Sequence, residues 1–264
     1  MSKILVLGDI HGRLIWYDII QKENPDLVIF LGDYVSTHEL ISAEQQLSNL
    51  EDILNYKSEN PDKVVLLRGN HDVQLLGYSW AECSGWDPKV YKGMLPMKER
   101  FLSLTQWIYR IPDTNIVCSH AGISDAFLKN VEEYLVNHGG SQYDDGSIDG
   151  EIVIDLINTI EPCELFGFTP CRMSDFCGES ATQPCTWIRP YTLLHYGVRD
   201  IIHVVGHTPI KHISNIKESS KELTLEQGMD PSYLDDYPDI WCCDNLQNGE
   251  YLIIEDGKFK SCKL

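Results

Sequence analysis

The sequence KILVLGDIHG at residues 3–12 sets the pattern for the rest of the chain. Ile4–Leu7 is a short apolar run of the kind found in buried parallel strands. The run stops at Gly8, and Asp9 and His11 follow at once. A carboxylate and an imidazole on one turn can face the same cation, and glycine allows the chain to turn tightly there.

Four further apolar runs end in the same way. They are Leu27–Leu31 before Gly32-Asp33, Val64–Leu67 before Arg68-Gly69-Asn70-His71-Asp72, Ile116–Cys118 before Ser119-His120-Ala121-Gly122, and Ile201–Val205 before Gly206-His207-Thr208-Pro209. In open α/β sheets, ligands bind outside the carboxyl ends of the strands, so we expect these polar residues to meet. Asp, Asn and His together suit a borderline divalent cation such as manganese, iron or zinc.

Helical patterns separate the first strands. Apolar residues at helical spacing predict helices over residues 13–24 and 39–57, the second including Leu40, so strands and helices alternate as in a parallel α/β layout. We also expect helices within residues 88–110, with Ile108 on the apolar face, and over residues 124–137, 151–160 and 191–199, and a polar loop over 139–150. β-like runs near the C-terminus predict a second, mixed sheet packed on the first.

Length, charge and composition limit the class of protein. A chain of 264 residues without an evident linker predicts a single domain over residues 1–264, with an irregular insertion at about 162–190. A net charge of −19 disfavours a nucleic-acid partner. Because no apolar run approaches the ~20 residues of a membrane span, we expect no membrane partner. The N-terminus enters the first strand directly, so we expect no signal peptide and a cytoplasmic protein.

The nine cysteines are an odd number, and a cytosolic location argues against a disulfide framework. Cys163, Cys171, Cys177 and Cys185 lie close together in the insertion but lack the paired spacing of structural zinc sites. Free thiols are the favoured interpretation, and a structural zinc site is the alternative.

The strand ends supply six candidate metal ligands: Asp9, His11, Asp33, Asn70, His120 and His207. Two cations about 3.5–4 Å apart need a bridging group, for which the carboxylate of Asp33 is suited. Asp9 and His11 would complete the first site, and the remaining three would complete the second. A water shared by two cations is deprotonated at neutral pH, and phosphorus is its natural target. His71 follows a ligand directly without being needed as one, which suits a general acid for the leaving oxygen.

With these motifs in the same order, the chain resembles the calcineurin-like metallophosphoesterases, and within them the PPP-type serine/threonine protein phosphatases of the compact bacterial and bacteriophage branch. The resemblance implies two mixed β-sheets flanked by helices, with a dinuclear site at the strand ends. It implies two divalent metal ions, with manganese favoured and iron or zinc as alternatives. It supports the same six ligands and His71 as the acid.

The resemblance also suggests residues that bind the substrate phosphate. Arg189, in Trp-Ile-Arg, matches the arginine that holds phosphate oxygens in this branch. Arg68 is a second candidate that could instead pack structurally, and Arg13 is a local alternative. The family usually continues Gly-Asp-x-Val with Asp-Arg-Gly, whereas this chain has Ser36 and Thr37. The aspartate that orients the catalytic histidine and a phosphate-binding arginine are therefore both replaced.

These observations predict hydrolysis of phosphomonoesters by direct attack of metal-bound hydroxide. The expected substrate is a phosphoprotein carrying phosphoserine, phosphothreonine or phosphotyrosine, or else a small phosphoester. Asp72 stands where PPP phosphatases usually carry Glu, and Asn-His-Asp is seen in diadenosine tetraphosphate hydrolases, which are the nearest alternative. A non-catalytic scaffold is a further alternative. The sequence sets no expectation for the oligomeric state.

Overall fold

The computed structural model describes residues 2–81, 83–138, 150–169 and 179–264. The strands are β1 (Lys3–Leu7), β2 (Leu27–Phe30), β3 (Val64–Leu66), β4 (Ile108–Arg110), β5 (Ile116–Ser119), β6 (Ile202–Val205), β7 (Ser214–Asn215), β8 (Asp239–Cys242), β9 (Glu250–Glu255) and β10 (Lys258–Lys263). The α-helices are α1 (Ile15–Glu23), α2 (Ala43–Glu59), α3 (Asn70–Gln74), α4 (Pro88–Met94), α5 (Lys98–Leu104), α6 (Asp125–His138), α7 (Gly150–Leu156), α8 (Pro190–Tyr196) and α9 (Ile216–Glu226).

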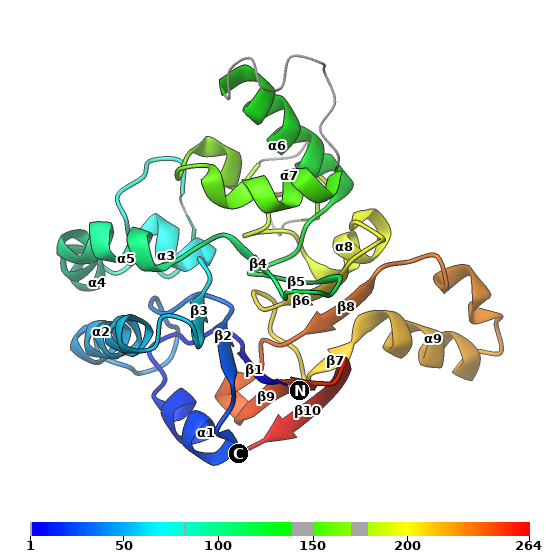
Figure 1. The fold of residues 1–264 in the computed structure, drawn as a ribbon, viewed down its shortest axis with the longest axis horizontal. Coiled ribbons are helices and arrows are strands. Elements are labelled where there is room, and N and C mark those ends of the chain that lie inside the picture. The colour runs from blue at the N-terminus through cyan, green and yellow to red at the C-terminus, as the bar shows by residue number, and fades with distance from the viewer. Residues whose placement is uncertain (1, 82, 139–149, 170–178) are drawn as a thin grey trace.

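Within the described residues, the strands form two five-stranded sheets (Figure 1). The first has the order β10-β9-β1-β2-β3, with β1, β2 and β3 parallel and β9 antiparallel to β1. The second has the order β4-β5-β6-β8-β7, with β5, β6 and β8 parallel. Both sheets are mixed and both are flanked by helices, which confirms the predicted fold class.

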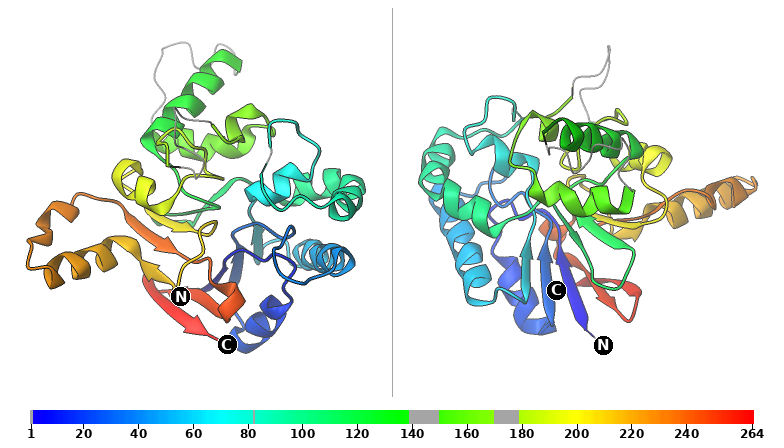
Figure 2. Two further views of the ribbon diagram at one scale, coloured as in Figure 1. Left: turned by 180° about the vertical axis from the view of Figure 1, so that it is seen from behind. Right: turned by 45° about the horizontal axis from the view of Figure 1, so that its top comes forward.

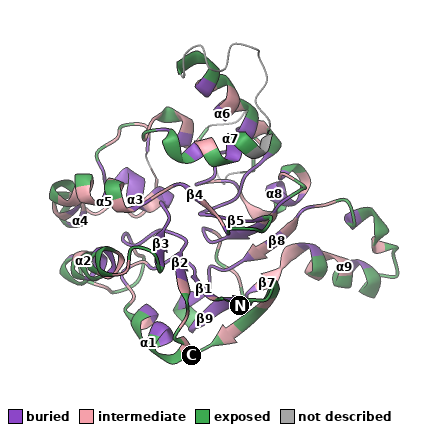
Figure 3. Ribbon diagram, in the orientation of Figure 1, coloured by how far each residue is buried: buried purple, intermediate pink, exposed green. Residues whose placement is uncertain are grey.

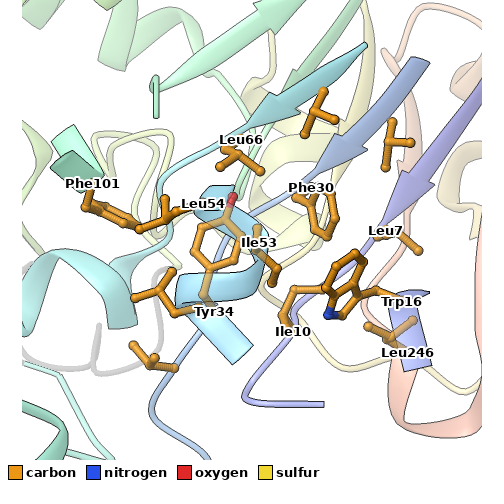
Figure 4. Close-up of a cluster of buried hydrophobic side chains, with 14 of the residues drawn as sticks. Leu7, Ile10, Trp16, Phe30, Tyr34, Ile53, Leu54, Leu66, Phe101 and Leu246 are labelled. Atoms are coloured by element: carbon orange, nitrogen blue, oxygen red, sulfur yellow. The ribbon is translucent and has the colours of Figure 1, made fainter. Parts of the chain in front are cut away.

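The two sheets pack face to face, and the alternation along β1 shows how. Ile4 and Val6 join a buried cluster that also contains residues of β5 and β6, so this face of β1 meets the second sheet. Leu5 and Leu7 join the cluster formed with α1, α2 and α5. Figure 4 shows part of this second cluster, where Trp16 and Phe30 lie between the sheet and the helices. With both faces covered, the central strands are buried and the outer helix faces are exposed (Figure 3).

Local capping decides where two of the expected helices begin and end. α1 ends at Asn24, which takes a left-handed conformation before Pro25, as expected. α2 begins at Ala43 and not at residue 39, because the Ser42 side chain accepts a hydrogen bond from the Gln45 N–H and caps the helix. The prediction of a helix over 39–57 was therefore wrong at its start, and Leu40 is fully exposed in the preceding loop.

Other boundaries also differ from expectation. The helical segment within residues 88–110 ends at Leu104, and Ile108 lies instead in β4, paired with Ser119. The C-terminal runs do not form the second sheet by themselves, since β9 and β10 extend the first sheet and β8 joins β6. α9 was missed, and it projects with its neighbouring turn away from the sheets (Figures 1 and 2). The expected loop at 139–150 lies almost entirely outside the described residues.

None of the helices in the described part of the chain combines the length and the apolar character needed to cross a bilayer. Cys171 and Cys177 lie outside the described residues, so the alternatives of a zinc site and free thiols for the group of four cysteines stay predictions. Among the described cysteines, which include Cys163 and the buried Cys185, there is no disulfide.

Candidate metal centre

The five motif-bearing strands end at one place, where the carboxyl ends of the two sheets meet. Within the second sheet, the Gly206 N–H donates to the His120 carbonyl after the paired strands β6 and β5. Between the two sheets, the His207 N–H donates to Asp9 Oδ1 at 2.9 Å. His11, Asp33 and His207 all have left-handed backbones, with φ of 45°, 50° and 61°. This conformation is uncommon for residues other than glycine and is often found at functional sites.

A glycine backbone lies in close contact with each of the two aspartates, Gly69 with Asp33 and Gly206 with Asp9. A Cβ built on Gly69 would overlap Asp33 Oδ1 and lie 2.8 Å from Asp33 Cγ. A Cβ on Gly206 would overlap Asp9 Oδ1 in the same way. The glycine beside each motif therefore leaves the space that a carboxylate occupies.

The first group of candidate ligands contains Asp9, His11 and Asp33. His11 Nε2 lies 3.8 Å from Asp9 Oδ2 and 4.0 Å from Asp33 Oδ2. The three offer ligand atoms within 4.8 Å of one another, which is the spacing expected around one cation.

The second group shares Asp33 with the first. His120 Nε2 lies 3.4 Å from Asp33 Oδ2 and 3.0 Å from Asn70 Oδ1. His207 Nδ1 also lies 3.0 Å from Asn70 Oδ1. Asp33, His120 and His207 form the second cluster with ligand atoms within 4.8 Å. The structure thus brings all six predicted ligands together, with Asp33 between the two groups.

The outer nitrogens of the three histidines support a metal centre. His11 Nδ1 lies 3.2 Å from the Val35 carbonyl, and His120 Nδ1 lies 2.8 Å from the Leu31 carbonyl. His207 Nε2 lies 3.1 Å from the Trp187 carbonyl. A neutral imidazole has one N–H, and a carbonyl can only accept it. In the neutral form of each ring, the other nitrogen presents a lone pair to the carboxylate and amide oxygens, as metal-bound histidines do. Burial lowers the pKa of His120, but Asp33 outweighs it and raises that pKa to about 10, so metal binding at His120 would release the ring proton. These residues fit a pair of divalent cations.

Burial and mutual charge give the two carboxylates different properties. Burial opposes ionisation of Asp33, but His120 and His71 outweigh it and hold its pKa well below the usual value. Burial raises the pKa of Asp9 well above its usual value, with Asp244 and Asp33 adding to the rise. Burial also lowers the pKa of His207 well below its usual value, which favours the neutral ring that a metal requires.

His71 lies beside the cluster, as expected. Its backbone N–H donates to Asp33 Oδ1 at 2.9 Å, and its ring meets the His11 ring edge-on at 5.5 Å. Burial lowers the pKa of His71 from its usual value. The ring Nδ1 lies 3.0 Å from Ser36 Oγ.

The three candidate arginines occupy different surroundings. Arg189 donates from Nη1 to the His207 carbonyl at 3.2 Å and to Thr208 Oγ1 at 3.0 Å, which puts it beside a candidate ligand. Arg13 donates to the Asp9 carbonyl at 3.0 Å and pairs with Glu39 at 2.6 Å.

Arg68 faces away from the metal centre. Its guanidinium donates to Thr105 Oγ1 and to two backbone carbonyls at 2.7–2.9 Å, and it stacks over the Trp107 ring at 4.7 Å. The structure thus favours structural packing for Arg68 over the phosphate-binding alternative.

Two buried acidic residues have roles that were not predicted from the sequence: Asp72 was noted only as a departure from the family pattern, and Asp244 was not named. Asp72 accepts backbone hydrogen bonds from Asp33, Tyr34 and Gly69 at 2.8–2.9 Å, and so holds the turn that carries Asp33. Asp244 is 3% exposed, and burial raises its pKa to about 6 while His11 opposes the rise. Asp244 follows β8 just as Asp9 follows β1, so the strand-end pattern could have found it.

Comparisons with known proteins agree with this geometry. A family model described as calcineurin-like phosphoesterase matches residues 2–243. Over 135 residues the chain is 32% identical to the serine/threonine-protein phosphatase ppe1 of Schizosaccharomyces pombe, covering 47% of this chain and 40% of that protein. The matched stretch is thus less than half of that relative's length.

Among solved structures, the cold-active protein-tyrosine phosphatase of a psychrophilic Shewanella species is similar. It has a TM-score of 0.53 and 15% sequence identity, and the match covers 100% of this chain and 78% of that one. A mutant cold-active protein tyrosine phosphatase gives the same TM-score at 16% identity, with the same coverage of both chains. At this level of identity the likeness concerns the fold.

Proposed function

The chain belongs to the calcineurin-like phosphoesterase family, which depends on a dinuclear metal centre. From that premise we propose that it is a metal-dependent phosphatase that hydrolyses phosphomonoesters. Its proposed substrates are phosphoproteins carrying phosphoserine, phosphothreonine or phosphotyrosine.

The observation that carries the proposal is the convergence on Asp33. Two clusters of ligand atoms share this carboxylate, and they come from strands of both sheets. The three histidines of these clusters each turn one nitrogen to a backbone carbonyl and the other to the cluster. Such an arrangement of buried carboxylates and oriented imidazoles suits two divalent cations, and manganese, iron and zinc all accept these ligands.

Each residue then has a proposed role. Asp9, His11 and Asp33 would hold one cation, and Asn70, His120 and His207 would hold the other with Asp33 between them. When bound, the pair of cations supplies an activated water and neutralises phosphate oxygens. The buried backbone around the ligands keeps this arrangement rigid, since the His207 N–H fixes Asp9 and the His71 N–H fixes Asp33.

Two further side chains would act on the substrate. His71 adjoins the shared carboxylate and is proposed to protonate the leaving oxygen. Arg189 lies beside the His207 turn, where it lowers the pKa of both His71 and His207, so its charge reaches the centre. We propose that it binds the phosphate oxygens. Arg13, which pairs with Glu39, is the alternative.

The substrate class rests on the serine/threonine-protein phosphatase relative. A nucleotide hydrolase of the diadenosine tetraphosphate type remains a second candidate because of the Asn70-His71-Asp72 motif. A non-catalytic scaffold is disfavoured, because such a protein would have no need to retain the six ligand-type residues around one buried carboxylate.

The test begins with protein stripped of metal by a chelator and resupplied with manganese, iron, zinc or magnesium. We expect about two ions per chain and turnover of a phosphopeptide well above that of a dinucleoside polyphosphate. Asp33→Ala should lose metal and most of the activity, whereas Asp62→Ala, at an exposed turn, should keep both. Full activity without metal would refute the proposed function, and preferential turnover of the dinucleotide would establish the second candidate.

A further inference from the structure

The hydroxyl of Ser36 lies between His71 and the backbone of Gly85. Ser36 is 2% exposed, and its Oγ lies 2.7 Å from the Gly85 carbonyl and 3.0 Å from His71 Nδ1. A carbonyl can only accept, so the single hydroxyl proton of Ser36 goes to Gly85. Toward His71 the same oxygen can therefore only accept.

This assignment fixes the tautomer of the His71 ring. If Ser36 Oγ accepts at Nδ1, then Nδ1 carries the N–H, and Nε2 is the nitrogen left to exchange a proton. The two ring nitrogens point in different directions, so Nε2 faces away from Ser36. Cys83 Sγ also lies near Nδ1, at 3.7 Å, and donates weakly to the Asn70 carbonyl.

The surrounding backbone holds Ser36 in place. Ser36 has a left-handed backbone with φ of 66°, and its N–H donates to Gln46 Oε1 at 2.8 Å. The Gln46 amide in turn donates to the Ile41 carbonyl at 3.0 Å, so α2 anchors both sides of the loop. At Gly85, φ is +75°, and an added Cβ would lie 2.8 Å from Ser36 Oγ and 3.7 Å from His71 Cε1. The contact thus requires a glycine at this position.

We propose that Ser36, held by Gly85 and Gln46, is a positioning residue that fixes the ring orientation and tautomer of His71. Its effect on turnover rests on the proposed function of His71 as the general acid. The hydroxyl does this without adding a negative charge to the centre, which already holds Asp9, Asp33 and Asp244.

The kinetic test uses two variants that lack Oγ. Glycine adopts the left-handed backbone of residue 36 without strain, whereas alanine does not. A loss of kcat that Ser36→Gly and Ser36→Ala share is therefore caused by removal of the hydroxyl and not by backbone strain. With an alkyl phosphate we expect kcat to fall by roughly tenfold, the loss expected for one hydrogen bond, with KM and metal content unchanged. With an aryl phosphate that has a good leaving group, the loss should be smaller. Gly85→Ala should reproduce the effect by displacing the hydroxyl.

A second measurement does not depend on activity. Nitrogen-15 NMR of the zinc-loaded protein should show His71 protonated at Nδ1 in the unmodified chain and a mixture of tautomers in Ser36→Gly. A His71 protonated at Nε2 in the unmodified chain would overturn the inference, as would an unchanged kcat on alkyl phosphates in both Ser36 variants. If the unmodified protein hydrolysed no phosphoester, the proposed function would fail, and the NMR result would still decide the role of Ser36.

Discussion

Replacing Gly69 by alanine should damage the metal centre without removing any ligand. The added Cβ would lie 2.8 Å from Asp33 Cγ, whereas carbon atoms in contact ordinarily lie about 3.5–4.0 Å apart. The same Cβ would lie 2.5 Å from the Asp33 backbone nitrogen, so the Asp33 backbone must shift and its carboxylate must retreat by roughly 1 Å. Metal sites tolerate about 0.2 Å, and a misplacement of about 1 Å at a catalytic centre can cost roughly 10²-fold in rate.

The same substitution should also lower the stability of the fold. Gly69 has φ of −96° and ψ of 167°, which alanine adopts without strain. Overpacking costs about 1–3 kcal/mol, and the stiffer unfolded chain offsets about 0.4–1 kcal/mol of that. Because the Asp33 backbone nitrogen is one of the atoms that must move, we expect a loss near the upper end of this range, about 2–3 kcal/mol of the free energy of unfolding, in a variant that still folds.

Three measurements decide the outcome: metal content by elemental analysis, kcat on an aryl phosphate, and urea unfolding of the metal-free protein. Gly228→Ala is the matched control. Gly228 has φ of +74° and nothing within 4 Å of an added Cβ, so this variant should lose about 1 kcal/mol of stability but keep metal and kcat. If Gly69→Ala bound the full complement of metal and turned over normally, the argument from close packing would be wrong.

The remaining predictions concern the proposed roles of individual residues. His71→Asn should keep both metals and slow turnover of alkyl phosphates by roughly 10²–10⁴-fold, with a smaller loss for aryl phosphates; equal losses would assign His71 another role. Arg189→Ala should lower kcat/KM by roughly 10–150-fold, mainly through KM and with metal retained. Arg13→Ala should lower kcat/KM by a smaller factor, because Arg13 pairs with Glu39. If Arg13→Ala lost most of its kcat/KM and Arg189→Ala kept it, the phosphate-binding arginine would be Arg13 in the first loop. Asp9→Asn should weaken metal binding by removing a charge, which calorimetric titration with zinc would measure; unchanged affinity would exclude Asp9 as a ligand.

Some boundaries of the fold could not be read from periodicity. Leu40 and Ile108 both fit helical spacing, yet the Ser42 cap starts α2 after Leu40, and pairing with Ser119 draws Ile108 into β4. The C-terminal strands are a similar case, because an apolar run does not say which sheet it will join. Such choices depend on partners distant in the sequence, and local patterns carry no information about those partners.

The sequence by itself determined the strand-end pattern and, through it, the six side chains that converge. A buried parallel strand followed by glycine and a ligand-type residue is a local signal, and parallel strands bring their carboxyl ends to one edge.

Only the tertiary structure decided which neighbours these side chains have. Arg68 and Arg189 are both arginines beside a motif, but Arg68 packs on Trp107 while Arg189 lies against the His207 turn. Likewise, Ser36 meets His71 only because the turn after β2 and the loop at Gly85 close on the same ring. Spacing along the chain can identify a residue as a candidate for the site. The direction of its side chain is set by packing between elements, and the local sequence does not specify that packing.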